Sequence, residues 1–205
     1  MRLIKAKYDI ITFDPERDAH DICLGYTTCY NSPMPETFEK RCDFIRKHRN
    51  HESQLEHSRL TVLFTINRAI SHELVRHRHC AFGQQSTRYC NYSKDRFDNR
   101  LTFINDSSIV KDSKSYELWL KGLKDDEELY FERLAEGDKP EQARGTLPND
   151  LATKLLVTTN YREWRSIFKL RCDSHAHYQM REVMIPLFNE VCAWLPCVFD
   201  DISFD

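Results

Sequence analysis

A change of hydrophobic period between residues 59 and 77 constrains the fold of this chain most. From Arg59 to Ile66 the apolar residues Leu60, Val62, Phe64 and Ile66 alternate with polar or smaller neighbours. This period of two predicts a strand with one buried face. From Arg68 to His77 the period lengthens, with Ile70, Leu74 and His77 spaced as a helical stripe. A strand that passes directly into a helix indicates a fold that mixes both kinds of element.

The rest of the chain carries weaker signals of the same two kinds. Helices are expected within residues 16–30 and 36–49, one or two within 91–141, one after Asn160, and a last one from a cap at Asp173–Ser174 to about Cys192. Strands are expected within residues 1–14, ended by Asp14–Pro15, and within 153–159. Residues 91–141 are the least patterned part.

The most unusual stretch runs from Arg76 to Tyr89, as Arg-His-Arg-His-Cys-Ala-Phe-Gly-Gln-Gln-Ser-Thr-Arg-Tyr. It begins at the end of the predicted helix and is expected to continue as a loop. No acidic residue falls between Arg76 and Arg88. Guanidinium groups suit phosphate, and Gly83 permits a turn whose N–H groups face an anion. The stretch is therefore a candidate phosphate site, with a solvated basic loop as the alternative.

Composition narrows the class of protein. The formal net charge is -2, which argues against a general nucleic-acid binder, although the basic stretch leaves that reading open. No run of eighteen apolar residues is present, and no signal-peptide core opens the sequence, so neither a membrane span nor secretion is expected. The eight cysteines include no C-x-x-C pair, which favours reduced thiols in a cytoplasm.

Arg171 occupies an unexpected position on the helix after Asn160. It continues the apolar stripe of Trp164, Ile167 and Phe168, where another leucine would be expected. A charge at that place requires a partner. The two alternatives are an internal salt bridge with a carboxylate and an arginine held in a mostly dry pocket for a ligand.

Three blocks together resemble the flavin-dependent thymidylate synthases. Arg76-His77-Arg78, followed by seven residues and Ser86, resembles the signature of that family. Residues 51–57, His-Glu-Ser-Gln-Leu-Glu-His, look like its H-E-[ST]-x-x-E-H segment. Residues 143–182 look like its C-terminal substrate and flavin block. The resemblance covers nearly the whole chain apart from about residues 91–141, a variable insertion or lid-like region.

The resemblance implies a fold, an activity and an assembly. The fold would be α+β, a single domain of residues 1–205 with an antiparallel or mixed sheet flanked by helices. The enzyme would methylate C5 of dUMP to give dTMP, with methylenetetrahydrofolate as carbon donor and NADPH as reductant through FAD. It would be a cytoplasmic homotetramer whose active sites are shared between subunits, without nucleic acid, membrane or metal.

The resemblance also assigns residues, position by position. The dUMP site would use Glu73, Arg76, Gln84, Gln85, Ser86, Thr87, Arg88, Arg144 and Arg171. The FAD site would use His51, Ser53, Arg76, His77, Arg78, Gln84, Asn160, Arg162 and His175. Arg171 would be the catalytic residue, because a guanidinium near N3 and O2 of uracil stabilises negative charge there and activates C5. No protein nucleophile is required, since the flavin supplies the redox chemistry.

Four positions depart from the family pattern. Glu73 stands where glutamine is frequent, and Gly83-Gln84 stands where Asn-Glu is common. Ser166 stands where a flavin-contacting asparagine is frequent, so that contact is not carried over. The departures keep open two alternatives: a related flavin-dependent C5 methylase or hydroxymethylase of another pyrimidine nucleotide such as UMP, or a nucleotide- or flavin-binding protein without catalysis. Metal binding by the H-x-H pairs His77/His79 and His175/His177 is a weaker alternative.

Overall fold

The computed structural model describes residues 1–204, which form two compact units. Unit 1 comprises residues 1–7, 64–74 and 83–155. Unit 2 comprises residues 8–63 and 75–82 together with the chain from residue 156 onward. The chain therefore alternates between the units. The single domain of residues 1–205 stays a prediction.

The fold is α+β with an antiparallel sheet, as expected. Its four strands follow the order β2-β3-β6-β4, with β2 at Lys7–Thr12, β3 at Arg59–Asn67, β6 at Ala152–Asn160 and β4 at Ala81–Gln84. A separate parallel pair joins β1 (Arg2–Ile4) to β5 (Thr102–Ile104), with Leu3 opposite Phe103. Strands β3, β4 and β6 each contribute residues to both units.

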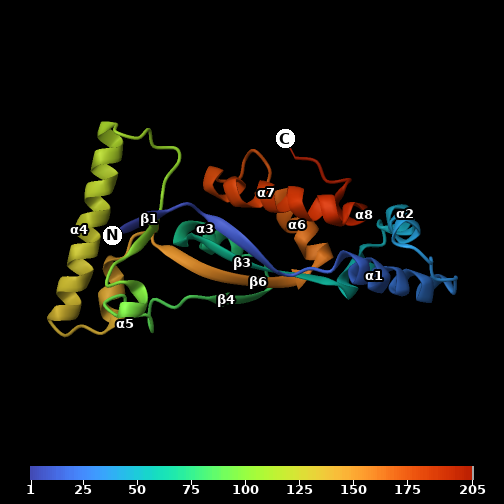
Figure 1. Ribbon diagram of the computed structural model, residues 1–205, viewed down its shortest axis with the longest axis horizontal. Helices are drawn as coiled ribbons and strands as arrows, with labels where there is room; N and C mark the ends of the chain where they lie inside the picture. The colour runs from blue at the N-terminus through green and yellow to red at the C-terminus, as the bar shows by residue number, and fades with distance from the viewer. Residues whose placement is uncertain (205) are drawn as a thin grey trace. The chain divides into compact units, whose positions relative to one another are not determined.

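Unit 1 has a core of its own to which the long helix α4 (Lys114–Ala135) contributes Leu123 and Tyr130. The short helices α3 (Arg68–Leu74), η2 (Asp95–Phe97), α5 (Pro140–Ala143) and η3 (Arg144–Thr146) complete it. In Figure 1, α4 is the long yellow-green helix, and it packs with α5. The core consists of Tyr92, Leu101, Phe103, Leu123, Tyr130, Ala143 and Leu151. Residues 91–141 thus form much of this unit; their role as a lid stays a prediction.

Unit 2 is built around the buried helix α6 (Tyr161–Arg171). Figure 1 shows α6 next to α7 (Tyr178–Trp194), followed by α8 (Pro196–Phe199). Phe168 packs against Trp164, Phe188 and Phe199 at ring distances of 5.4 to 5.6 Å. The Trp164 indole N–H donates to the Leu60 carbonyl at 3.0 Å, which fastens α6 to β3. The other helices of the unit are α1 (Pro15–Tyr30), α2 (Phe38–His48) and η1 (Glu52–His57).

Local sequence explains where the helices begin. The side chains of Asp14, Thr37, Ser113 and Asn160 each accept a backbone N–H bond at a helix start, which is the usual role of these residue types. The cap predicted at Asn160 is confirmed, with its Oδ1 accepting from the Glu163 N–H at 2.9 Å. Asn31 ends α1 in the left-handed region with φ of 48°, which asparagine tolerates.

Four details of the predicted elements are wrong. The strand expected within residues 1–14 is two strands, β1 and β2, interrupted at residues 5–6. Residues 81–84 form strand β4 rather than a loop. Strand β3 is buried on both faces, because Thr61 and Thr65 lie inside as well as the apolar residues. The last helix is capped by His177, whose ring accepts from the Gln179 N–H, and not by Asp173–Ser174.

Candidate functional site

A polar cavity in unit 2 brings residues of three sequence blocks together. It has a volume of about 340 Å³ and is lined by Glu56, His79, Asn160, Arg162, Glu163 and Ser166. Glu56 comes from η1, His79 from the basic stretch, and the others from the start of α6. Asn160 and Arg162 are two of the residues that the sequence resemblance assigns to flavin.

Arg162 is held in place by the acidic residues of η1. Its Nη1 donates to Glu56 Oε1 at 2.7 Å, and its Nε lies 3.5 Å from Glu52 Oε2. The hydrogen bond to Glu56 raises the pKa of the guanidinium above its usual value. Half of the side chain remains exposed. The Arg162 guanidinium is therefore oriented by two carboxylates while part of it still faces solvent.

His77 is the buried centre of a chain of three polar side chains. Arg171 Nε donates to His77 Nε2 at 3.1 Å, and His77 Nδ1 lies 3.1 Å from Glu163 Oε1. Burial and the charge of Arg171 lower the pKa of His77, against the opposing effect of Glu163. These contacts supply the partner that the charge of Arg171 requires on its apolar helix stripe. Arg171 contacts the His77 imidazole, which in turn contacts the Glu163 carboxylate.

The two arginines on either side of His77 have different surroundings. Arg76 and Arg78 are exposed, whereas His77 is 8 % exposed. Within residues 1–204, neither Arg76 nor Arg78 makes a side-chain hydrogen bond or an ion pair. Their guanidinium donors are available to a ligand, as a phosphate site requires.

The remaining residues assigned to flavin in unit 2 lie at its surface. His51 and Ser53 are exposed next to and within η1. His175 is exposed as well, and its ring Nδ1 lies 2.8 Å from Asp173 Oδ1. All residues assigned to FAD belong to unit 2 except Gln84.

Most residues assigned to dUMP belong to unit 1, and Arg76 and Arg171 are the exceptions. The Gln84 amide donates to Ser71 Oγ at 2.8 Å and to Thr153 Oγ1 at 3.5 Å. This amide is therefore anchored by two hydroxyl groups. Glu73, at the end of α3, is half-buried.

The end of the basic stretch turns back on itself. The Ser86 hydroxyl accepts from the Arg88 N–H at 3.2 Å, and Thr87 is buried. Arg88 Nε donates to Glu141 Oε2 at 2.9 Å, although both side chains are largely exposed. Arg144, in η3, is also exposed.

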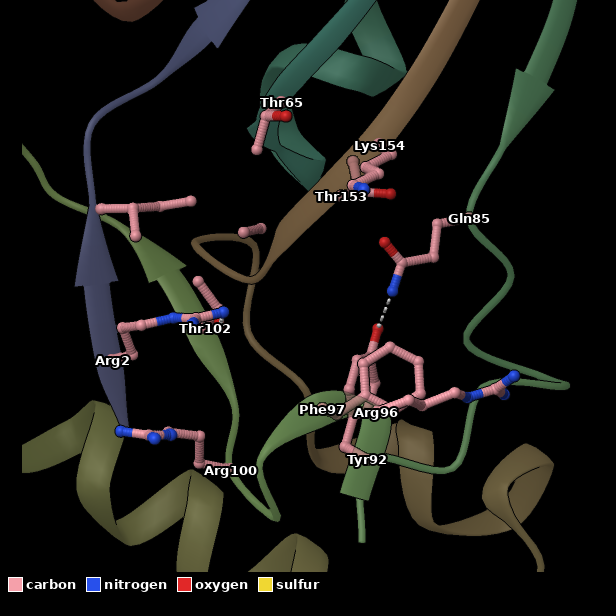
Figure 2. A pocket seen from close by; sticks show the side chains of 12 residues that line it. Arg2, Thr65, Gln85, Tyr92, Arg96, Phe97, Arg100, Thr102, Thr153 and Lys154 are labelled. Carbon is pink, nitrogen blue, oxygen red and sulfur yellow. Dashed lines mark hydrogen bonds between the residues drawn. The ribbon is translucent and has the colours of Figure 1, made fainter. Parts of the chain in front are cut away.

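Unit 1 contains a second cavity, of about 230 Å³, that sequence reasoning did not identify. Figure 2 shows Gln85 on one side of it, donating to the Tyr92 hydroxyl at 3.4 Å. Its remaining lining residues are Arg2, Ile4, Thr65, Arg96, Phe97, Arg100, Thr102, Ala152, Thr153 and Lys154. Four of them are cationic and none is acidic. Asp98, outside the lining, pairs with Arg2 and Arg100 at 3.3 and 3.6 Å.

Sequence reasoning missed Glu163, Glu52 and Glu56 as partners of the site. Glu163 follows Asn160 by three residues, a spacing typical of a helix cap. Because the cap already accounts for a glutamate at this position, nothing in the sequence indicated its contact with His77. Glu52 and Glu56 are spaced four residues apart in the block His51–His57. This spacing places two carboxylates on the same side of a helical turn, and it could have predicted that both bind one cation.

Neither a metal cluster nor a membrane helix is found in the described part of the chain. No group of three or more His, Cys, Asp or Glu side chains within residues 1–204 could hold a metal ion. Likewise, none of the helices formed by these residues is long and apolar enough to cross a membrane.

Comparison with known proteins gives consistent matches. The family model described as "Thymidylate synthase complementing protein" matches residues 12–197. A flavin-dependent thymidylate synthase of Pyrococcus abyssi is 37% identical over 166 residues, which cover 76% of this chain and 66% of that protein. Its counterpart in Pyrococcus furiosus is 38% identical over 144 residues, covering 69% of this chain and 57% of the relative. The chain thus spans less than two thirds of these two relatives.

Two further matches extend over more of the chain. A flavin-dependent thymidylate synthase of Mycobacterium sp. (strain JLS) is 31% identical over 215 aligned positions, covering 93% of this chain and 82% of the relative. Among solved structures, the UMP/dUMP methylase PolB from Streptomyces cacaoi, bound with 5-Br dUMP, has a TM-score of 0.80. At 17% identity it covers 98% of this chain and 96% of that chain. This last likeness supports the fold.

Proposed function

Because this chain belongs to the thymidylate synthase complementing protein family, we propose that it is a flavin-dependent thymidylate synthase. It methylates dUMP at C5 to give dTMP, takes the carbon from methylenetetrahydrofolate, and uses NADPH as reductant through FAD. It works as a cytoplasmic homotetramer with active sites shared between subunits.

The main support for this proposal is that residues from three separate sequence blocks line one cavity. Glu56, His79 and Arg162 are far apart in the sequence, yet all three line the cavity of unit 2. Each comes from one of the blocks that resemble the family. A chance similarity confined to short motifs would give no reason for the three blocks to converge.

The residues of unit 2 fit an anionic cofactor. Arg78 offers guanidinium donors that no other side chain of residues 1–204 uses, and Arg162 is oriented by Glu52 and Glu56. Arginine binds phosphate groups well because its donors form a planar fork. We assign FAD to His51, Ser53, Arg76, His77, Arg78, Gln84, Asn160, Arg162 and His175. FAD supplies the redox chemistry of the reaction when bound.

The nucleotide residues bind and polarise the substrate. We assign dUMP to Glu73, Arg76, Gln84, Gln85, Ser86, Thr87, Arg88, Arg144 and Arg171. Arg88 and Arg144 are exposed cations suited to phosphate. Arg171 stabilises negative charge at N3 and O2 of the uracil ring, which activates C5.

Cys80, within the basic stretch, and Cys172, next to Arg171, give no support to a protein nucleophile. Burial raises the pKa of the Cys80 thiol to about 11 and that of Cys172 to about 12. Both therefore remain protonated near neutral pH, and the thiolate is the nucleophilic form. This is consistent with chemistry that depends on the flavin.

Release of tritium from C5-labelled dUMP tests the proposal. The purified protein is incubated with FAD, NADPH and methylenetetrahydrofolate, and parallel reactions contain UMP. We expect release from dUMP and a dTMP product by mass spectrometry. Release from UMP alone would redirect the proposal to another pyrimidine. Binding of FAD and dUMP without release would instead support a protein that has lost catalysis.

A further inference from the structure

We propose that Glu163 is a positioning residue that fixes the orientation of the Arg171 guanidinium through the His77 ring. The inference rests on the proposed function, in which Arg171 contacts the uracil ring. It assigns a role to a residue that the family resemblance does not mark.

Glu163 and Arg171 are too far apart on α6 to touch. They are eight residues apart, which corresponds to roughly 12 Å along a helix axis. His77 enters from a different segment, after α3, and bridges the two residues with contacts of 3.1 Å on both sides of its ring. The imidazole therefore transmits the position of one side chain to the other.

The two contacts define the protonation of the ring. Arginine can only donate, so His77 Nε2 must accept from Arg171 Nε and cannot carry a proton. Nδ1 then carries the proton and donates it to Glu163 Oε1. The ring is neutral in this arrangement. The opposite tautomer would place two N–H groups against each other at Nε2 and would break this contact with Arg171 Nε.

Burial makes this arrangement specific. The His77 side chain is 8% exposed and that of Glu163 is 14% exposed, so water gives little competition for either contact. Without Glu163, the Nδ1–H group would lose the carboxylate that now accepts its proton at 3.1 Å. The tautomer with a proton on Nε2 would then become accessible.

Glu163 also has a purely structural contribution that the test must separate. It lies in the first turn of α6, where a negative charge stabilises the helix. Glu163→Ala removes both this charge and the acceptor. Glu163→Gln removes the charge but retains a carbonyl oxygen that can accept from Nδ1–H. The pair of variants distinguishes the two roles.

The experiment combines ring nitrogen spectra with kinetics. In ¹⁵N-histidine-labelled protein, with His77 assigned from a His77→Gln spectrum, we expect the Nδ1–H tautomer in the wild type and its loss in Glu163→Ala. Steady-state turnover of dUMP should fall by roughly 10- to 100-fold in Glu163→Ala, the range of one hydrogen bond to a charged group. Glu163→Gln should recover part of this loss, although both variants lose the helix charge.

A double-mutant cycle with Arg171→Ala completes the test. If Glu163 acts through Arg171, then Glu163→Ala should lower activity much less in the Arg171→Ala background. Fully additive losses, equal activities of the alanine and glutamine variants, or an Nε2–H tautomer in the wild type would overturn the inference. A wild type with the Nδ1–H tautomer but without dUMP turnover would overturn the proposed function instead, because the spectra do not depend on activity.

Discussion

Replacing Asp201 with alanine tests what anchors α6 in unit 2. Arg165, in the middle of α6, is buried, with 5% of its side chain exposed. Its Nη1 and Nη2 donate to the two carboxylate oxygens of Asp201 at 2.6 and 2.8 Å, and it also donates to the Val198 carbonyl. Asp201→Ala removes one acceptor from Nη1 and one from Nη2 of this buried guanidinium.

The size of the loss follows from this burial. Breaking a fully buried ion pair costs about 3–5 kcal/mol. Asp201 is 34% exposed, and the Val198 carbonyl remains, so we expect a loss of about 2–3 kcal/mol in the free energy of unfolding. This corresponds to a fall in Tm of roughly 4–12 °C for a chain of this size. Urea unfolding followed by tryptophan fluorescence would measure it, since Trp164 lies in α6.

The adjacent aspartate provides a matched control. Asp200 pairs with Arg46 and Arg49, whose side chains are 39% and 16% exposed. We expect Asp200→Ala to cost about 1 kcal/mol, because solvent weakens the pair with Arg46. In addition, Arg49 keeps a second partner, Asp201, at 3.5 Å. Equal losses for the two variants would refute the argument that burial of Arg165 sets the magnitude.

Three further predictions concern the cap, the cofactor and pH. Asn160→Ala removes the acceptor of the Glu163 N–H and should lower stability by about 1 kcal/mol, whereas Asn160→Ser should recover much of it; equal unfolding curves for the two would contradict the cap. Arg78→Ala should change stability by less than about 0.5 kcal/mol, because Arg78 is exposed, yet weaken FAD binding roughly 10-fold or more in a fluorescence titration; unchanged affinity would remove Arg78 from the flavin site. The hydrogen bond from Arg165 lowers the pKa of Asp201 below its usual value of 3.8, so this pair stabilises the fold above that pH and its contribution is lost as pH falls through the lower folded pKa. The urea midpoint should therefore fall less on acidification in Asp201→Asn than in the wild type, and an identical decline would contradict this assignment.

Sequence patterns predicted the elements whose residues repeat regularly. Burial imposes a period of two on strands and of 3.6 on helices. This periodicity predicted the strand from Arg59, the helix after Asn160 and the inward face of the last helix. The boundary errors have local causes. Strand β4 is only four residues long, too short for an alternation to stand out. Thr61 and Thr65 are buried on the second face of β3 although they are polar, and Thr61 satisfies its hydroxyl by a bond with Thr158, so the polar residues at these positions did not indicate an exposed face.

The contacts of the site were less predictable than the helices and strands. The sequence showed that Arg171 needs a partner, because a charge that interrupts an apolar stripe is visible within a single helix. Its contact with His77 joins residues 94 positions apart, and no local pattern encodes such a contact. The cationic cavity of unit 1 was not predicted for the same reason. Arg2 begins β1, Arg100 precedes β5, and Arg96 lies in η2; the parallel pairing of β1 with β5 brings Arg2 close to the other two.

The alternation of the chain between its two units has a consequence for the order of synthesis. Unit 1 uses no residue beyond 155, whereas unit 2 requires the chain from residue 156 onward. Proteins emerge from the ribosome N-terminus first, so helix α1 is made early and can pack against α2 and η1, which follow it directly. Asp18 of α1 bonds to the Tyr161 hydroxyl, 143 residues later. The nascent chain can therefore contain every residue of unit 1 before the partner of Asp18 exists, and the contact between α1 and Tyr161 is among the last that unit 2 can form.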